Sequence, residues 1–519
     1  MPVIKTITKF FDEHQSVLYI LVFIISLGLF IYLNFNATFA DPDSFYHAKM
    51  ALVIRDQGMI TEFPWLSATT LKYNYIDHHF LYHLILIPFV SLLDPLVGLK
   101  IANIIFATLF MVVFFWFLKQ LKVRGAFWYT LFLITISPFI FRLNLAKAQP
   151  LVLILLFLSL YFLFNRRYLS LLFTSFCYVW LYAGWPLIIV LAAIYLVISW
   201  FKNKHQSGWR LFKNCNRQIV RQNLTLFFCI ITGTAAGLFF SPYFAKNIYF
   251  YWQQTFKIAV VNYQSLIGVG GEWYPYLLPD LLKAAPLFFI LFTTALFLFI
   301  ISIKRQTAVS WAFVVFSFLF FFLTLKSRRN VEYFIPVAVC FCGLAITSYF
   351  NTLRNRIFKP KIPGISVSIL FFVLFITVAI FYRGIIEVKN SFAAGFSFEK
   401  FSEPAVWLKE NTPPGSIVFH SDWDEFPFLF YNNSHNYYLV GLDPTFMYEY
   451  DQELHRRWVA ITTGESNKDL YQTIKMIFGA QYVFVDLNSN SAFDRNLANN
   501  FYFVPVFENS EARIYQVLD

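Results

Sequence analysis

Apolar runs of about 20 residues recur along the first 384 residues of this chain and are absent from residues 385–519. A run of about that length allows one α-helix to cross the hydrocarbon core of a membrane. Of the 519 residues, 58% are hydrophobic and 13% are charged, whereas soluble domains are about 25% charged. We therefore predict a polytopic α-helical membrane domain at residues 1–384 and a soluble α/β domain at residues 385–519.

Eleven spans are predicted from these runs. They lie near residues 17–39, 97–118, 126–141, 150–165, 168–183, 185–201, 223–242, 284–303, 308–325, 334–351 and 365–382. Five of the intervening loops carry Lys and Arg without any Asp or Glu, which is typical of the cytoplasmic side. These loops are 119–125, 166–167, 202–222, 304–307 and 352–364. The prediction is a multi-pass plasma-membrane protein whose C-terminal domain faces outside.

The net charge of +12 divides unevenly along the chain. Residues 385–519 hold nine Lys or Arg and 18 Asp or Glu, a net charge of −9, which leaves +21 for the membrane part. Because cytoplasmic loops account for a basic membrane part, the charge does not indicate a nucleic-acid partner. The five cysteines all precede residue 385, so the outer domain has no disulfide framework.

A carboxylate pair, Asp41 and Asp43, follows the first span directly. Acidic side chains beside membrane spans are rare and commonly bind ions, protons or polar substrates. One interpretation is a general base that activates an acceptor hydroxyl or amide. The alternative is ordinary charge at a helix end in the interface. The sequence leaves both open.

Two outward loops are long, at about residues 40–96 and 243–283. The apolar stretch Phe80–Leu93 is interpreted as a partly buried helix of the first loop. In the second loop, glycines at 268, 270 and 271 precede Glu272, and a glycine-rich segment of this kind can close over a substrate. Such long loops in compact proteins are commonly functional.

One short outward loop breaks the charge rule, because it contains Lys326, Arg328 and Arg329. Arginine offers fork-shaped donors that suit phosphate, so the loop is a candidate anion clamp. Contact with lipid headgroups is the alternative.

Residues 385–519 change to short β runs that alternate with helices. Strands are predicted at 416–420, 437–442, 482–486 and 512–517, and helices at about 401–411, 445–461 and 467–478. Apolar residues at helical spacing in the last two helices indicate packing on a sheet, as in a small α/β domain.

Several of these segments resemble the catalytic subunit of oligosaccharyltransferases and, more widely, the GT-C superfamily of membrane glycosyltransferases. Asp41-Pro42-Asp43 is similar to the aspartate motif of that family's first outer loop, and Gly271-Glu272-Trp273 to the glutamate of its mobile outer loop. Arg328 and Arg329 match the region that clamps the lipid pyrophosphate. The segment 407–424 resembles the approach to the family's tryptophan-tryptophan-aspartate signature.

The chain departs from the family pattern in two places. The signature reads Asp422-Trp423-Asp424-Glu425-Phe426, so acceptor binding by Trp423 and Asp424 is implied without the usual sequon motif. The second outer loop, residues 142–149, lacks the family's acidic metal pair.

A divalent metal, Mn²⁺ or Mg²⁺, therefore needs other ligands. The candidates are Asp43, Asp77, His78, His79 and Glu272, and His79 lies one helical turn from His83.

The resemblance implies a transferase that moves a sugar or oligosaccharide from a polyprenyl-(pyro)phosphate carrier to a protein or glycan acceptor outside the membrane. The catalytic candidates are Asp41, Asp43 and Glu272, and the donor-phosphate candidates are Lys326, Arg328 and Arg329. A transporter or flippase for a lipid-linked or polar solute is the alternative, although the acids gather on one side and no internal repeat is apparent. A catalytically inactive scaffold is the third hypothesis.

Overall fold

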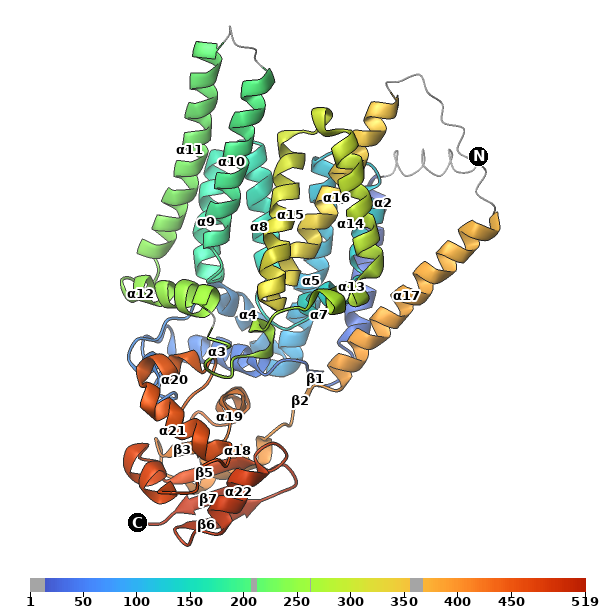
Figure 1. Ribbon diagram of the computed structural model, residues 1–519. Helices are drawn as coiled ribbons and strands as arrows, with labels where there is room; N and C mark the ends of the chain where they lie inside the picture. The colour runs from blue at the N-terminus through green and yellow to red at the C-terminus, as the bar shows by residue number, and fades with distance from the viewer. Residues whose placement is uncertain (1–14, 207–211, 262, 355–366) are drawn as a thin grey trace. The chain divides into compact units, whose positions relative to one another are not determined.

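The computed structural model describes residues 15–206, 212–261, 263–354 and 367–519. The chain divides into two compact units (Figure 1). The first comprises Met1–Asn36, Ile101–Phe240 and Glu272–Ala394, and the second comprises Ala37–Lys100, Ser241–Gly271 and Gly395–Asp519. Most of each long outward loop thus groups with the C-terminal segment.

The first unit is a bundle of helices. They are α2 (Gln15–Leu33), α5 (Pro95–Gln120, which starts in the second unit), α6 (Ala126–Leu133), α7 (Ser137–Leu143), α8 (Gln149–Phe164), α9 (Tyr168–Leu181), α10 (Pro186–Gln206), α11 (Phe212–Phe239), α13 (Leu278–Ala284), α14 (Pro286–Ile301), α15 (Ala308–Lys326), α16 (Val331–Arg354) and α17 (Val367–Ala393). Each predicted span contains one of these helices or a bent pair of them. Over the described residues, five helices are long and apolar enough to cross a membrane, or seven if each bent pair is one span. The count of eleven stays a prediction, and the predicted segments 202–222, 352–364 and 365–382 lie partly outside the described residues.

Two sharp bends interrupt this bundle. Helices α6 and α7 meet at 78°, and α13 and α14 meet at 101°. In each case a proline stands in the first turn of the second helix, Pro138 in α7 and Pro286 in α14. Proline lacks an N–H and therefore starts a helix more readily than it continues one. The first bend leaves Arg142 in the last turn of a short helix, and the second sets α13 across the direction of α14.

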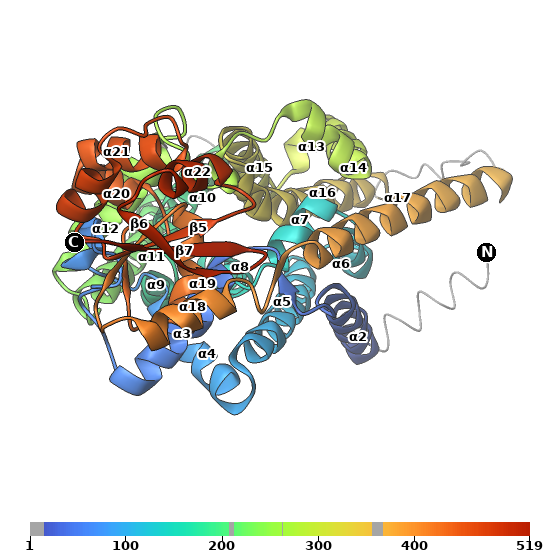
Figure 2. The same cartoon turned by 90° about the horizontal axis from the view of Figure 1, so that it is seen from below.

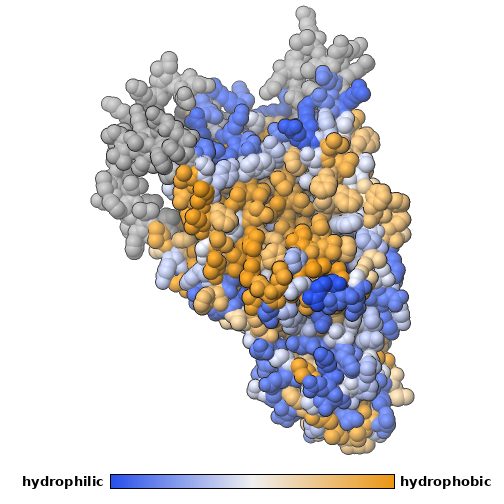
Figure 3. Space-filling model, turned by 180° about the vertical axis from the view of Figure 1, so that it is seen from behind, coloured by the Kyte–Doolittle hydropathy of each residue, from blue (hydrophilic) through white to orange (hydrophobic). Residues whose placement is uncertain are grey.

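The surface of the bundle is apolar over a broad area. Figure 3 shows hydrophobic side chains gathered over the helices of the first unit. Large apolar side chains that are well exposed include Ile290 and Phe297 on α14 and Phe322 on α15. Burial in lipid explains such a surface, because a soluble protein rarely exposes a large contiguous apolar patch. The chain is therefore a multi-pass membrane protein.

The second unit contains a five-stranded sheet in the order β4-β3-β5-β7-β6. The strands are β3 (Ile417–His420), β4 (Tyr437–Tyr438), β5 (Tyr482–Asp486), β6 (Phe503–Glu508) and β7 (Ala512–Val517). Strand β3 pairs in parallel with β4 and β5, whereas β7 is antiparallel to β5 and β6. The helices of this segment are α18 (Ser402–Asn411), α19 (Phe426–Asn432), α20 (Thr445–Tyr450), α21 (Gln452–Thr462) and α22 (Ser491–Ala498).

The sheet is covered on both faces (Figure 2). Successive side chains of a strand point to opposite faces. Val483 and Val485 of β5 therefore join the core beneath α21 and α22, whereas Phe484 between them meets Phe401 just before α18. This arrangement is the α/β layering predicted from the alternating pattern.

The remaining elements of the second unit lie in the two outward loops and beside them. They are β1 (Thr38–Phe39), α3 (Asp43–Gln57), α4 (Phe80–Leu92), α12 (Lys246–Trp252) and β2 (Phe396–Ser397). Strand β1 pairs antiparallel with β2, so residues far apart in sequence are joined. Helix α4 is the predicted partly buried helix, with Tyr82, His83, Leu86 and Val90 inside.

Candidate functional site

The strongest concentration of buried charge in the described part of the first unit surrounds Glu272. The Glu272 Oε2 atom lies 2.5 Å from Arg142 Nη1 and 4.0 Å from Lys147 Nζ, and Oε1 lies 3.2 Å from Arg329 Nη1. Arg142 also donates from Nε and Nη2 to Glu332 Oε2, at 3.0 and 2.8 Å. We call these five residues, Arg142, Lys147, Glu272, Arg329 and Glu332, the Glu272 cluster.

Four separate segments supply the cluster. Arg142 ends α7, Lys147 lies between α7 and α8, and Glu272 occupies a short 3-10 turn, Gly271–Trp273. Arg329 lies in the turn between α15 and α16, and Glu332 in the first turn of α16. The bend before α7 is what brings a basic side chain from one helix end to the others.

Neighbouring groups hold the cluster in place. The Arg329 guanidinium carbon lies 4.2 Å from the centre of the Trp273 ring, and Arg329 Nη2 donates to the Tyr182 hydroxyl at 2.7 Å. Ser327 Oγ donates to the Glu272 carbonyl at 2.9 Å. Cation–π contact and these hydrogen bonds fix the orientation of both charged partners.

The three cations keep Glu272 ionised. Burial by itself raises the pKa of this carboxyl, but the charges of Arg329, Lys147 and Arg142 hold its pKa well below the usual range. A carboxylate in this state neither takes nor gives a proton near neutral pH, so it is unsuited to general acid or base work. The cluster holds three cations and two carboxylates.

The predicted phosphate-binding residues divide between two environments. Arg329 is in the cluster. Arg328 is exposed and supports the backbone, because its N–H donates to the Tyr274 carbonyl at 2.9 Å, and Lys326 is exposed at the end of α15.

Arg142, Lys147 and Glu332 were missed as site residues. Arg142 and Lys147 also break the charge rule for an outward loop, which is the signal that would have found them.

The aspartate pair lies in the second unit, at the start of α3. The Asp43 N–H donates to Asp41 Oδ1 at 2.9 Å, so Asp41 closes the turn into the helix. Asp43 stands in the first turn of α3, where the helix dipole favours a negative charge. The hydrogen bond and the helix start fix the positions of both residues, and their catalytic role stays a prediction.

Behind this turn lies a buried chain of hydrogen bonds. Asp77 Oδ2 lies 2.6 Å from His83 Nδ1, and His83 Nε2 lies 2.8 Å from His47 Nδ1. Asp77 Oδ1 also accepts from the His79 N–H at 3.0 Å. The His78 and His79 rings lie beside each other, with centroids 4.1 Å apart.

These donors do not fit a metal ion in this conformation. His79 is the N-cap of α4 and His83 lies one turn into it: the His83 N–H donates to the His79 carbonyl at 2.9 Å, and the two ring centroids lie 6.2 Å apart. Both ring nitrogens of His83 are occupied, and Glu272 is surrounded by cations. Among the described residues, no group of three or more His, Cys, Asp or Glu side chains has the arrangement of a metal site. The divalent metal stays a prediction, and no step below uses it.

The predicted acceptor residues lie on a 3-10 turn, Trp423–Glu425, that follows β3. Asp422 is the capping residue: it accepts from the Trp423 N–H at 2.7 Å, while Glu425 Oε2 accepts from the Asp422 N–H at 2.9 Å. Trp423 packs partly against the domain core. Its acceptor-binding role, with that of Asp424, stays a prediction.

Four carboxylates crowd this turn. Burial, followed by the charges of Asp422, Glu425 and Asp486, raises the pKa of Asp424 to about 7. Burial also raises the pKa of Asp422 and raises that of Glu425 further. The Ser421 hydroxyl donates to Glu425, so that carboxyl is satisfied within the domain.

The raised pKa of Asp424 predicts how the stability of the folded protein changes with pH. Between about pH 4 and pH 7 the unfolded chain releases this proton and the folded chain retains it, so the carboxyl destabilises the fold increasingly as pH rises. Asp424→Asn should raise the thermal midpoint of the purified protein by roughly 5 °C at pH 8 and change it little at pH 4. Glu410→Gln, at an exposed position, is the control. An equal shift at both pH values would contradict this assignment.

Comparisons with known proteins bear on the fold. No protein-family model matches the chain, and no curated protein matches it in sequence. The archaeal oligosaccharyltransferase AglB from Archaeoglobus fulgidus, solved with an inhibitory peptide and a dolichol-phosphate, is similar in structure with a TM-score of 0.61 and 13% identity. The match covers 95% of this chain and 73% of that one.

Two further solved structures share the architecture. ArnT from Cupriavidus metallidurans, bound to undecaprenyl phosphate, has a TM-score of 0.53 and 12% identity over 96% of this chain and 97% of its own. The arabinofuranosyltransferase AftD from Mycobacteria has a TM-score of 0.57 and 12% identity over 96% of this chain and 40% of its own. At these identities the likeness concerns the fold, and the chain has the fold of the GT-C membrane glycosyltransferases.

Proposed function

We propose that this protein is a membrane glycosyltransferase that uses a polyprenyl-(pyro)phosphate sugar donor and an acceptor on the outer face of the plasma membrane. The observation that supports it most is the Glu272 cluster, where three cations converge on one carboxylate. Arginine and lysine at these distances suit a phosphate group, because charge-assisted hydrogen bonds from a guanidinium fork match its oxygens. AglB and ArnT, which share the fold, were solved with lipid phosphates.

The cluster provides the leaving-group site in this proposal. Glu272 holds the place of the donor phosphate, and the arriving phosphate displaces it from Arg142, Lys147 and Arg329. The glycines at 268, 270 and 271 before Glu272 give its backbone the freedom to move. The three cations then neutralise the negative charge that grows on the departing phosphate, and such electrostatic stabilisation is usually the largest catalytic contribution.

The family resemblance, and not the geometry, assigns activation of the acceptor to Asp41 or Asp43. The acceptor oxygen or nitrogen attacks the anomeric carbon of the donor sugar, and a new bond from that carbon to the acceptor forms. The bond from the anomeric carbon to the phosphate oxygen breaks, and its electron pair stays on the phosphate. The carboxylate takes the acceptor proton and later releases it to water.

The two aspartates are tested by conservative changes. Asp43→Asn is expected to lower kcat by 10²-fold or more, since general-base catalysis typically contributes about 10²–10⁴-fold, while donor binding is unchanged. The assay is transfer of radiolabelled sugar from polyprenyl carriers to endogenous macromolecules. Asp56→Asn is the matched control, because Asp56 lies on the same helix in an exposed pair with Arg55.

The same assay separates the enzyme from a transporter. Normal turnover by Asp41→Asn combined with Asp43→Asn would remove the aspartates from the mechanism. Counterflow of substrate across sealed vesicles without any labelled product would overturn the transferase proposal itself.

A further inference from the structure

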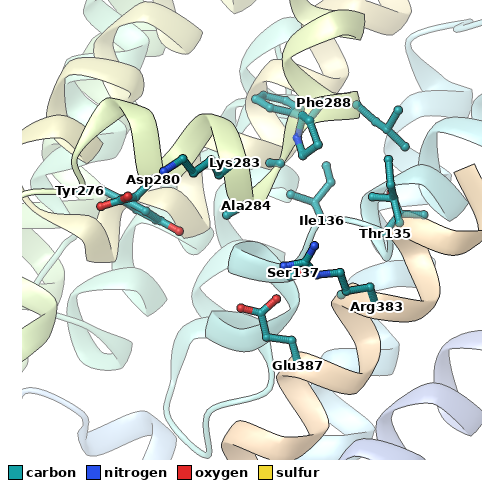
Figure 4. Close-up of a pocket in the computed structure, with 15 residues that line it drawn as sticks. Thr135, Ile136, Ser137, Tyr276, Asp280, Lys283, Ala284, Phe288, Arg383 and Glu387 are labelled. Carbon is teal, nitrogen blue, oxygen red and sulfur yellow. The ribbon is translucent and has the colours of Figure 1, made fainter. Parts of the chain in front are cut away.

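A cavity of about 390 Å³ lies in the first unit among α7, α13, α14 and α17. Four charged side chains line it: Asp280 and Lys283 from α13, and Arg383 and Glu387 from α17. Figure 4 shows these side chains around the hollow, with Phe288 and Ile136 on its apolar side. We call it the α13–α17 pocket.

The bend between α13 and α14 indicates the depth of this pocket in the membrane. Since α14 is apolar throughout and α13 turns away from it by 101°, α13 lies along the membrane surface where α14 leaves the hydrocarbon. Tyr382, next to Arg383, is 66% exposed, and tyrosine is enriched at the boundary between membrane and water. Val378, one turn earlier on α17, is an exposed apolar residue. The pocket therefore opens toward lipid at headgroup level.

The charges in the pocket are balanced but not paired with one another. Two carboxylates and two cations line the same hollow, and none of the four side chains makes an ion pair or a hydrogen bond with another side chain in the described part of the chain. Burial raises the pKa of Tyr276, a further lining residue, and the charges of Asp280 and Glu387 raise this pKa further. All four residues are exposed, so their charged groups are accessible to a ligand.

The ligand must match this charge pattern. A simple anion would be repelled by the two carboxylates, and a simple cation would be repelled by Lys283 and Arg383. A phosphate ester that also carries a primary ammonium satisfies all four groups. An attached hydrocarbon chain then finds Phe288 and Ile380, which line the same cavity.

We propose that the α13–α17 pocket binds the headgroup of a phosphoethanolamine lipid. Lys283 and Arg383 hold the phosphate, Asp280 and Glu387 accept hydrogen bonds from the ammonium, and the acyl chains follow α14 and α17. Gly384 supports this arrangement, because a Cβ there would lie 2.3 Å from Ser137 Oγ, and so α17 sits close against α7 beside the pocket. This site is independent of glycosyl transfer.

Native mass spectrometry of the detergent-purified chain tests it. The probes are phosphatidylethanolamine, phosphatidylcholine and phosphatidylglycerol with the same acyl chains. Phosphatidylethanolamine should be retained about tenfold better than the other two, because a quaternary ammonium cannot donate hydrogen bonds and glycerol carries no cation.

Two paired variants identify the contacts. Lys283→Ala with Arg383→Ala, and Asp280→Asn with Glu387→Gln, should each reduce phosphatidylethanolamine retention by about tenfold. Arg55→Gln with Asp56→Asn changes an exposed pair elsewhere and should leave retention unchanged. Equal retention of phosphatidylglycerol, preferential retention of undecaprenyl phosphate, or full retention by the acid variant would each overturn the proposal.

Discussion

Replacing Arg142 with methionine is expected to destabilise the protein by about 3–5 kcal/mol, because the change leaves buried carboxylates without their cation. Glu332 loses both of the bonds that Arg142 donates to it, and its side chain is only 1% exposed. Its other oxygen, Oε1, has no hydrogen-bond partner among the described residues. Chemical denaturation in detergent, followed by circular dichroism, measures the loss.

The same change should also abolish sugar transfer, since Arg142 is one of the three cations proposed to bind the donor phosphate. A second substitution separates the two effects. Arg142→Met combined with Glu332→Leu replaces a buried ion pair with apolar side chains, which commonly restores stability. We expect near-normal unfolding of this double variant and no transfer. A stable double variant with full activity would reduce Arg142 to a structural residue.

Changing Glu272 to glutamine is expected to tighten binding of the lipid phosphate by about tenfold, the effect of a 1.4 kcal/mol difference. The carboxylate competes with phosphate for Arg142, Lys147 and Arg329, and the amide has the same shape without the charge. Displacing a neutral amide from three cations therefore costs the ligand less free energy than displacing a carboxylate. Titration with radiolabelled undecaprenyl phosphate measures the dissociation constant.

This result distinguishes two roles of Glu272. If Glu272 is a catalytic carboxylate, its substitution lowers turnover and leaves donor affinity unchanged. If Glu272 is a resident anion that competes with phosphate, its substitution raises donor affinity. Glu449→Gln is the matched control, because Glu449 Oε1 lies 3.4 Å from Lys257 Nζ and outside the cluster. Weaker binding by the Glu272 variant would contradict the competition.

Much of the fold could be predicted because its signals are local. Apolar runs marked the positions of the helices of the first unit, and β5 and β7 were found with their observed bounds. Strand β6 was missed because Pro505 interrupts its run, and a proline is tolerated there since β6 is the edge of the sheet. The helix predicted at 445–461 is wrong in one respect: it breaks at Asp451, whose side chain caps α21.

Other differences in this domain have similar causes. The strand predicted at 437–442 is wrong in length, because β4 pairs with β3 only at Tyr437 and Tyr438. Helices α19 and α22 were not predicted because each is eight residues or shorter, too few for a periodic pattern to show.

The candidate site was less predictable because it depends on contacts over long sequence separations. Arg142 and Glu332 are 190 positions apart, and no local pattern joins them. The spacing of His79 and His83 suggested a metal pair, and the two residues do lie one helical turn apart, but the ring nitrogens of His83 are occupied by Asp77 and His47, which the spacing did not show.

The central claim is that the Glu272 cluster binds the phosphate of a polyprenyl carrier. A cryo-EM structure of the protein with undecaprenyl phosphate tests it most directly. We predict the phosphate within hydrogen-bonding distance of Arg142, Lys147 and Arg329, with the Glu272 carboxylate displaced from Arg142. A phosphate bound elsewhere, with Glu272 still paired to Arg142, would contradict the account.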